Sequence, residues 1–304
     1  EGADPLKCEA PPPDPRIEEL LQADPEDQRI NITSDEGELG REGDATLTGN
    51  VRIRIGQRLL TADAAEIDAT AHIGPHVTIE AGAVVKAGAI IEHGCFIGRE
   101  ATVGEGTHLF ANVTFHRKCI IGARGIVHSG AVIGGDGFGF ANEAGVYIKI
   151  PQTGRVVIGD DVDIGSNTSI DRGALADTII EDGVKLDNQI QIGHNCHIGK
   201  HTAMAGCVGV AGSAKIGSRC TFGGAAMVLG HLEIADNVHI SSGSMVSRSV
   251  LEPGQYTGFY PLAKNAEWEK SAAIVRNLNT MRDKIRALEK TIKTITEHSK
   301  PEND

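Results

Sequence analysis

The chain has 304 residues, with 41 acidic and 29 basic side chains and a formal net charge of −12 at pH 7. Its length suits one or two domains, and its acidic balance argues against nucleic acids and anionic membrane surfaces as partners. No stretch is apolar and long enough to span a bilayer. Because the chain starts at Glu1 without a signal-peptide pattern, we expect it to be processed, truncated or engineered.

The N-terminal part divides into two segments of different texture. Residues 1–28 form an acidic, proline-rich lead, a composition that buries too little surface to order itself, so we expect it to be disordered or extended. Residues 29–66 hold three runs rich in Thr, Val and Ile that predict antiparallel strands. Within them apolar and basic residues alternate, as expected for one buried and one solvated face: Val51, Arg52, Ile53, Arg54 and Ile55. We expect these strands to cap the next segment, because no linker follows them and an uncovered end would leave unpaired edge groups.

A repeat of six residues dominates the middle of the chain. Apolar residues recur at this interval in three runs, Ile67–Ile133, Ile158–Ile170 and Ile180–Val246. Neither the 3.6-residue period of a helix nor the alternation of an ordinary strand gives this pattern. It predicts a parallel β-helix over residues 67–252, in which three repeats close a triangular coil. Each periodic residue then points inward and stacks on the residue 18 positions away, about 4.8 Å along the axis.

Four cysteines share one phase of this repeat. Each lies four places after a periodic residue, in a slot where Ala and Ser also recur: Cys95, Cys119, Cys196 and Cys220. The slot suits small buried side chains, which predicts structural thiols and not disulfides. Cys8 stands alone in the polar lead and is interpreted as a remnant of a disulfide partner.

Two insertions interrupt the repeat. Residues 134–157 are expected to be extruded as a loop, and Asp171–Leu175 as a shorter protrusion. The segment Gly135–Gly139 is glycine-rich but lacks the Lys-Ser/Thr and the following helix of a phosphate-binding loop. Two interpretations stand, a loop that shapes a functional site and an incidental glycine-rich turn.

The phase of the repeat also aligns polar residues into columns. Two places after stacked inward residues lie His194, Gly212, Gly230 and Arg248, and the next column holds Asn195, Ser213, His231 and Ser249. His194 and His231 therefore share one side, about 10 Å apart along the axis, and are candidate catalytic residues. Between them the glycines leave a bare groove. Met245 is expected at the corner one coil beyond His231, where it would stop an apolar chain.

Three histidines invite a metal interpretation. His194, His197 and His201 are spaced i, i+3 and i+7, which brings them together only on an α-helix. On a β-helix we expect His197 at a corner and His201 on the next side, so that the three diverge and form no metal site.

Residues 253–304 change period again. Apolar residues at alternating four and three spacing predict one helix with a heptad stripe that supercoils with copies of itself: Ile274, Leu278, Met281, Ile285, Leu288, Ile292 and Ile295. Basic residues lie off that stripe, among them Arg276 and Arg282. They are interpreted either as a solvated coiled-coil face or as a docking surface for an acidic carrier protein.

One resemblance concerns the N-terminal strands. The string ITSDEGELGREGDATLTGNVRIRIGQRLLTADAAEID resembles the periplasmic N-terminal domain of the lipopolysaccharide-assembly outer-membrane protein, the LptD family. That resemblance implies an open β-jellyroll that joins lipopolysaccharide-transport partners edge to edge, with a native source in the periplasm or outer membrane. It covers about 40 residues.

A second, longer resemblance covers the chain from about Ala69. The strings GGDGFGFANEAGVYIKIPQTGRVVIGD, SIDRGALADTIIEDGVKLDNQIQIGHN and WEKSAAIVRNL closely resemble UDP-3-O-acylglucosamine N-acyltransferases, the LpxD family. The resemblance implies a cytoplasmic homotrimer of left-handed β-helices with active sites between subunits. It implies transfer of a 3-hydroxyacyl chain from acyl carrier protein, whose phosphopantetheine thioester is a co-substrate, to the 2-amine of UDP-3-O-acylglucosamine. No bound cofactor is implied.

The same resemblance suggests roles for individual residues. His194 matches the general base, Asp187 the residue that orients it, and Met245 the chain-length ruler of an acyl groove along Gly212 and Gly230. Carrier-protein binding is expected at Arg248, Arg276 and Arg282. The uridine-binding domain that precedes the β-helix in the family is replaced here by the LptD-like strands, which predicts a chimera, engineered or natural. Two functions remain open, an acyltransferase impaired by that replacement and a trimeric scaffold that displays the N-terminal fragment.

Overall fold

The computed structural model describes residues 30–33, 36–39, 45–55, 58–260 and 262–298. The predicted lead of residues 1–28 and Cys8 lie outside these ranges. The chain forms two compact units, the first ending at Gly258 and the second starting at Phe259. The second unit therefore begins six residues later than the boundary predicted at 252/253. Within the described residues, no helix has the length and apolar character needed to cross a membrane.

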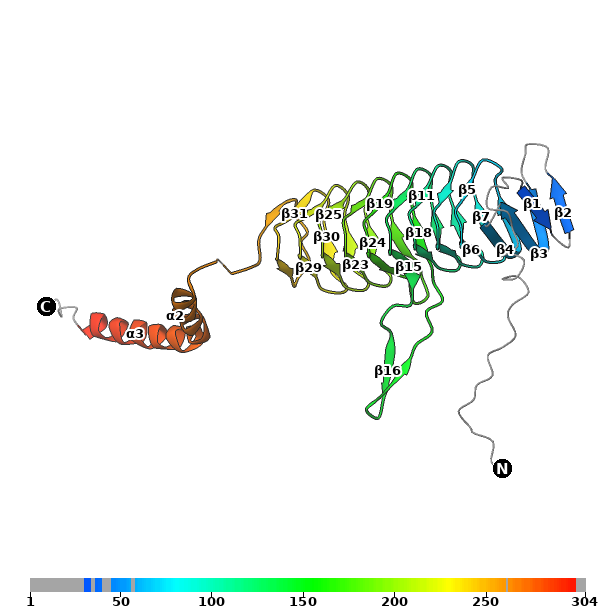
Figure 1. The fold of residues 1–304 in the computed structure, drawn as a ribbon. Helices are drawn as coiled ribbons and strands as arrows, with labels where there is room; N and C mark the ends of the chain where they lie inside the picture. Colours follow the sequence, from blue (N-terminus) through cyan, green and yellow to red (C-terminus); the bar gives the residue numbers. More distant parts are fainter. Residues whose placement is uncertain (1–29, 34–35, 40–44, 56–57, 261, 299–304) are drawn as a thin grey trace, which may run out of the picture. The chain divides into compact units, whose positions relative to one another are not determined.

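The first unit is a parallel β-helix with three long sheets (Figure 1). The first sheet begins with β1 (Ile30–Thr33), β2 (Glu36–Leu39), β3 (Ala45–Ile55) and β4 (Arg58–Ile67). It continues through β7 (Ala83–Val85), β10 (Thr102–Val103), β13 (Ile120–Ile121), β18 (Val156–Ile158), β21 (Thr178–Ile180), β24 (His197–Ile198), β27 (Lys215–Ile216) and β30 (Glu233–Ile234).

The other two sheets form the remaining sides of each coil. The second contains β5 (His72–Ile73), β8 (Ile90–Ile91), β11 (His108–Leu109), β14 (Ile126–Val127), β19 (Asp163–Ile164), β22 (Lys185–Leu186), β25 (Ala203–Met204), β28 (Thr221–Phe222), β31 (Val238–Ile240) and β33 (Gly254–Tyr256). The third contains β6 (Thr78–Ile79), β9 (Phe96–Ile97), β12 (Thr114–Phe115), β15 (Val132–Gly135), β20 (Ser169–Asp171), β23 (Gln191–Ile192), β26 (Gly209–Val210), β29 (Met227–Val228) and β32 (Met245–Val246).

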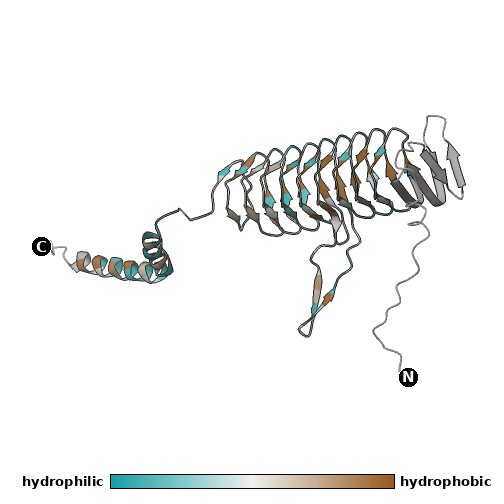
Figure 2. Ribbon diagram, viewed as in Figure 1, coloured by the Kyte–Doolittle hydropathy of each residue, from teal (hydrophilic) through white to brown (hydrophobic). Residues whose placement is uncertain are grey.

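The inward residues of the repeat build the core, as predicted. Leu109 pairs with Val127 in parallel register, 18 positions along the chain, and both are fully buried. Apolar residues consequently recur in coil after coil along the β-helix (Figure 2). The four cysteines of the repeat are buried free thiols, which confirms their structural role. Burial raises the pKa of the Cys196 thiol to about 11, so this sulfur stays protonated near neutral pH.

Corners of the coil are made by residues with positive φ, which lie three places after an inward residue. In one column these are Asn195, Ser213 and His231, with φ of 59°, 62° and 61°. Their backbone N–H groups connect successive coils: Ser213 donates to His194 O at 2.8 Å, and His231 donates to Gly212 O at 3.0 Å. The corner ladder therefore fixes the order of the predicted site residues along the axis.

The N-terminal strands continue the β-helix, as predicted. β4 pairs in parallel with β7, Ile67 opposite Val85, and β3 pairs antiparallel with the other edge of β4. β1 and β2 in turn pair with β3. Since β4 runs through the predicted boundary at residues 66/67, the cap and the first coil share one continuous strand.

The first insertion is the predicted extruded loop. It leaves the β-helix after β15 and forms an antiparallel hairpin of β16 (Phe140–Glu143) and β17 (Val146–Lys149) before β18 resumes the coil. At its base, Arg172 is buried and donates from Nε to Gly134 O at 2.7 Å and from Nη2 to Arg117 O at 2.9 Å. Burial lowers the pKa of the Arg172 guanidinium.

The second unit holds two helices, α2 (Asn265–Arg276) and α3 (Leu278–His298), where the heptad stripe predicted one. The prediction was wrong at Asn277, whose N–H bonds Ile274 O, three residues back, and whose side-chain amide donates to Ala273 O at 2.9 Å. Asparagine competes for backbone hydrogen bonds in this way and favours helix ends. In the isolated chain the apolar stripe is exposed from Ile274 to Ile295.

Candidate functional site

His194 lies at a corner of the coil, two residues after β23, and its imidazole is flanked by backbone where side chains would otherwise crowd it. A Cβ added to Gly212 of the next coil would lie 2.6 Å from His194 Nε2. A Cβ added to Gly137 of the extruded loop would lie 2.7 Å from His194 Cβ and 3.1 Å from its Cδ2. The ring therefore lies between two glycine backbones, and a side chain at either glycine would occupy the space that the ring needs.

The extruded loop thus packs against His194, which favours the site-shaping interpretation over an incidental turn, although that role stays a prediction. The segment that returns from β17 to β18 carries Gln152, which is buried and donates from Nε2 to Ile150 O at 3.1 Å. Gln152 Oε1 is buried without a hydrogen-bond partner and lies 3.1 Å from the same added Cβ of Gly137. The glycine-rich segment consequently packs between this amide and the imidazole, where only glycine fits. Sequence reasoning missed Gln152, because the insertion lies outside the repeat that assigned the other positions.

The shorter protrusion also touches the site. Asn195, adjacent to His194, places Oδ1 3.0 Å from His194 Nδ1. The same oxygen accepts a hydrogen bond from Ala174 N at 3.0 Å, and Asn195 Nδ2 donates to Ala176 O at 2.9 Å. One side chain therefore connects the imidazole to the backbone of the protrusion. The column analysis aligned Asn195 with Ser213 and His231 but gave it no role.

Asp171 is a third residue to which the sequence gave no role. It ends β20, one coil before His194, and its Oδ2 accepts a hydrogen bond from Gln191 Nε2 at 3.0 Å. Partial burial raises the pKa of the Asp171 carboxyl, while the Gln191 hydrogen bond and the nearby His194 oppose that effect. Asp171 thus adds a half-buried carboxyl close to the imidazole.

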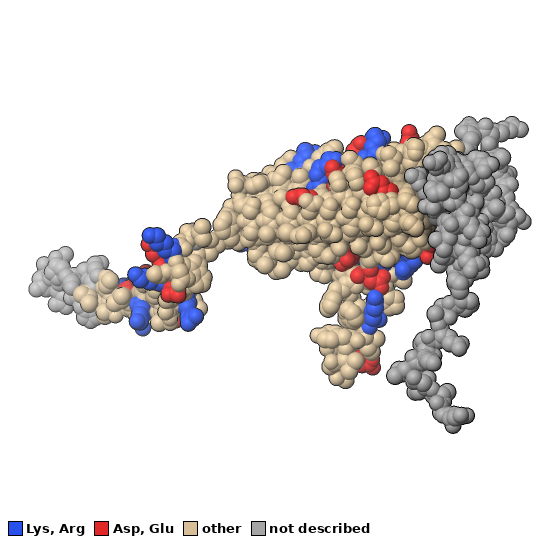
Figure 3. Space-filling view, viewed as in Figure 1, with Lys and Arg blue, Asp and Glu red and all other residues tan. Residues whose placement is uncertain are grey.

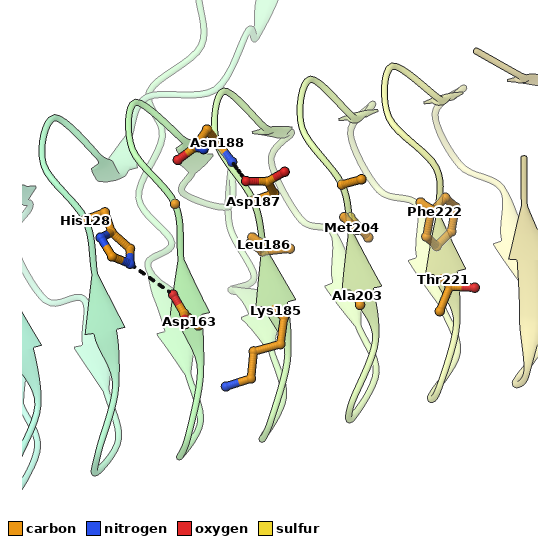
Figure 4. A pocket seen from close by; sticks show the side chains of 12 residues that line it. His128, Asp163, Lys185, Leu186, Asp187, Asn188, Ala203, Met204, Thr221 and Phe222 are labelled. Atoms are coloured by element: carbon orange, nitrogen blue, oxygen red, sulfur yellow. Dashed lines mark hydrogen bonds and ion pairs between the residues drawn. The ribbon is translucent and has the colours of Figure 1, made fainter. Parts of the chain in front are cut away.

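Asp187, the predicted orienting residue, lies elsewhere in the coil. It follows β22 of the second sheet, whereas His194 follows β23 of the third, and its Oδ1 accepts a hydrogen bond from Asn188 N at 2.8 Å. The side chain lines a recess of about 570 Å³ (Figure 4). Its lining includes the apolar residues Met204 and Phe222, and it also includes His128 and Asp163, whose Nε2 and Oδ1 atoms are 3.5 Å apart. Within one chain, the side chain in hydrogen-bond contact with His194 is Asn195.

The predicted acyl groove along the glycine column stays a prediction. Gly212 lies one coil beyond His194, and Gly230 directly precedes His231 in the following coil, as the hydrogen-bond ladder of the corners indicates. Met245 was predicted at a corner, and this prediction was wrong. The residue lies in β32 of the third sheet, beside Met227 of β29. The phase was misjudged because the bend falls three places after an inward residue and Met245 directly precedes one. Both methionine side chains are about half exposed.

Arg248 lies close to Met245. The two residues line one small recess of about 170 Å³ with Tyr256 and Gly258. The other predicted carrier-binding residues belong to the second unit, Arg276 in the last turn of α2 and Arg282 in α3, where Arg282 Nη2 lies 3.0 Å from Asp283 Oδ1. Figure 3 shows basic side chains at several places on these helices, with acidic side chains among them.

The three histidines of the metal interpretation diverge, although not in the predicted way. His197 lies in strand β24 and not at a corner, with Nε2 2.8 Å from Glu181 Oε1. His201 occupies the following corner, with φ of 57°. Among the described residues, His, Cys, Asp and Glu form no group of three or more suited to a metal ion.

Comparison with known proteins supports a common origin for most of the chain. A model of the hexapeptide repeat of succinyl-transferase matches residues 88–114. The UDP-3-O-acylglucosamine N-acyltransferase of Janthinobacterium sp. (strain Marseille) is 82% identical over 205 residues, which cover 67% of this chain and 58% of the relative. The enzyme of the same name from Herminiimonas arsenicoxydans is 80% identical over 200 residues, which cover 66% and 57%.

Two-thirds of this chain is therefore homologous to these acyltransferases, and the chain spans less than two thirds of their length. Solved structures agree on the fold. The UDP-N-acetylglucosamine acyltransferase of Francisella novicida superposes with a TM-score of 0.55 at 24% identity, over 68% of this chain and 73% of its own. That of Arabidopsis has a TM-score of 0.56 at 22% identity, over 64% and 69%. The predicted left-handed parallel β-helix is confirmed.

Proposed function

We propose that this protein is an N-acyltransferase that moves a 3-hydroxyacyl chain from acyl carrier protein to the 2-amine of UDP-3-O-acylglucosamine. The observation that carries the proposal is the setting of His194, a corner imidazole that fits between the backbones of Gly137 and Gly212. It lies within a fold shared with acyltransferases and in a chain highly identical to N-acyltransferases of that name.

The reaction needs a general base next to a bound amine. As the amine nitrogen attacks the thioester carbonyl, His194 Nε2 takes its proton, a C–N bond forms and the C–S bond breaks. The thiolate of the phosphopantetheine arm leaves and takes up that proton. No bound cofactor enters this scheme, in which the carrier-protein thioester is a co-substrate.

Asp187 fits this scheme as a residue contributed by a neighbouring subunit. In one chain it lies after a different sheet from His194, and the Nδ1 side of the ring is occupied by Asn195. The family resemblance implies a homotrimer with sites between subunits. We therefore propose that the partner subunit's Asp187 supplies negative charge that stabilises the imidazolium formed during proton transfer.

The acyl chain is proposed to follow the groove of Gly212 and Gly230 toward Met245. Half-exposed methionine is suited to contact an apolar chain, because its unbranched side chain adapts its shape. His231 faces the same groove one column over, where it is proposed to contact the substrate. Arg248 beside Met245, with Arg276 and Arg282 on the helices, is proposed to attract the acidic carrier protein.

A second function is favoured by one observation, that the antiparallel strands β1–β4 extend the first sheet of the β-helix. In that case the chain is a trimeric scaffold displaying an LptD-like fragment, able to join lipopolysaccharide-transport components edge to edge. The acyltransferase is proposed to act in the cytoplasm, whereas the resemblance of that fragment implies a native source in the periplasm or outer membrane.

Acyl transfer from acyl carrier protein to UDP-3-O-acylglucosamine tests the proposal directly. His194→Ala is expected to lower turnover by about 10²- to 10⁴-fold, the usual contribution of a positioned base. His239→Ala is the matched control, since His239 lies on the second sheet, where it contacts Thr221. Absence of transfer by a folded wild-type trimer would refute the enzyme proposal in favour of the scaffold.

A further inference from the structure

Backbone interactions of Asn195 hold its side chain in contact with His194. Asn195 is a corner residue with φ of 59°, and its backbone N–H is held by Thr178 Oγ1 at 2.8 Å. Asn is among the residues that tolerate this left-handed conformation. The backbone thus presents the side-chain amide toward both the protrusion and the ring, with little rotational choice.

The two ends of the Asn195 amide are identified by their backbone partners. Ala174 N is a donor only, so the atom 3.0 Å from it is the oxygen, and Ala176 O is an acceptor only, so the atom 2.9 Å from it is the nitrogen. A flipped amide would set donor against donor and acceptor against acceptor. The atom 3.0 Å from His194 Nδ1 is consequently an acceptor.

This assignment determines the state of the imidazole. A nitrogen facing an acceptor carries the hydrogen, and in a neutral imidazole the other nitrogen then has the lone pair. The neutral ring therefore has Nδ1–H directed at Asn195, and its basic Nε2 lies beside Gly212, which has no side chain to cover it.

We propose that Asn195 is a positioning residue, which holds His194 in the tautomer that leaves Nε2 free to act as the base. The protrusion at residues 173–176 is the frame that holds Asn195 in turn. Its fit is close, because a Cβ on Gly173 would lie 2.7 Å from Asn195 Nδ2. An amide fixes the tautomer without adding charge, whereas a carboxylate in the same place would also stabilise the imidazolium and raise the pKa of the base.

The inference rests on the proposed function for its catalytic meaning, but the tautomer is measurable without turnover. The experiment uses the full-length chain labelled with ¹⁵N-histidine and records the nitrogen shifts of the imidazoles, with His194→Ala assigning the signal. We expect a protonated Nδ1 and an unprotonated Nε2 in the wild type. Asn195→Gly, which retains access to positive φ, is expected to give a mixture of tautomers. The matched control is Asn237→Gly at another corner, with φ of 58°, where the amide accepts from Arg219 Nε.

Kinetics separate positioning from a merely structural role. Asn195→Gly is expected to lower kcat by about tenfold to a hundredfold, as for other residues that orient a functional histidine. Asn195→Asp keeps the acceptor and adds negative charge, so it is expected to move the acidic limb of the pH–rate profile, which reports the base His194, upward by about one unit or more. A purely structural role predicts loss of stability with no such movement.

The outcomes are distinguishable. A wild-type His194 protonated at Nε2, or an Asn195→Gly spectrum that retains the wild-type tautomer, would overturn the inference about Asn195. A wild type with the expected tautomer and no acyl transfer would support that inference and refute the proposed function alone. Circular dichroism of each variant verifies that the β-helix is intact.

Discussion

Gly212 gives the sharpest test of how closely the site is built. In Gly212→Ala the new methyl carbon would lie 2.6 Å from His194 Nε2 and 2.8 Å from its Cε1. The backbone of Gly212 does not have positive φ, so the substitution introduces no conformational strain of that kind. To restore the 3.4 Å of an ordinary contact, the imidazole has to retreat by about 0.8 Å.

A displacement of this size is expected to lower the catalytic rate strongly and to change the stability of the fold little. A misplacement of about 1 Å in a reacting group costs roughly 10²-fold in rate, equivalent to about 2.7 kcal/mol of transition-state stabilisation. The methyl group faces the site and not the packed interior. We therefore expect Gly212→Ala to lower kcat by about a hundredfold while its thermal unfolding resembles that of the wild type.

The assay is acyl transfer from acyl carrier protein, measured with the unfolding transition of the same sample. Gly224→Ala is the matched control, because the nearest atom to its added Cβ is Gly206 O at an ordinary 3.4 Å. If Gly212→Ala retains more than half of the wild-type turnover, the reaction of the amine does not depend on the close fit of His194 Nε2 against Gly212. A hundredfold loss in Gly224→Ala would likewise show that general disturbance of the coil, and not contact with His194, lowers the rate.

Three further predictions concern assembly and charge. Light scattering is expected to give three times the 32.0 kDa of one chain, and a monomer at micromolar concentration would contradict the trimer. Co-expression of His194→Ala with Asp187→Ala is expected to recover about a quarter of the wild-type activity, because mixed trimers place intact partners across one interface in four; no recovery would locate both residues in a site within one chain. Burial raises the folded-state pKa of Asp171 above its unfolded value, so folding takes up a proton whose stabilising effect is lost as pH rises through the raised pKa. Asp171→Asn should therefore unfold at a higher temperature than wild type at neutral pH, and the difference should disappear below about pH 4; an equal difference at both pH values would show that titration of Asp171 is not its cause.

The sequence by itself determined the β-helix, its inward residues and the continuity of the N-terminal strands. These features depend on contacts between residues at a constant separation, such as Leu109 on Val127, so a pattern in the sequence records them directly. The alignment of His194 with Gly212 and of Asn195 with His231 follows from the same constant separation. For this reason the columns predicted from the repeat coincide with the columns of the folded chain.

The six-residue period does not specify which of the six positions forms the bend between two strands. Met245 and His197 were therefore assigned to corners although both lie in strands. The heptad stripe likewise continues through Asn277, where local hydrogen bonds end α2. In each case a periodic pattern specifies which residues share a face, while the local backbone decides how the chain turns.

The surroundings of His194 were decided only by the tertiary structure. Two segments enclose the ring, the loop with Gly137 and the protrusion with Ala174. Both are insertions that lack the six-residue repeat, so the repeat does not predict where they lie relative to the coil. Their position depends on hydrogen bonds between residues far apart in the chain. Arg172 donates to Gly134 O, 38 residues away, and Arg117 donates to Gln152 O, 35 residues away. Contacts at irregular separations leave no period in a single sequence, and the folded chain is needed to bring them together.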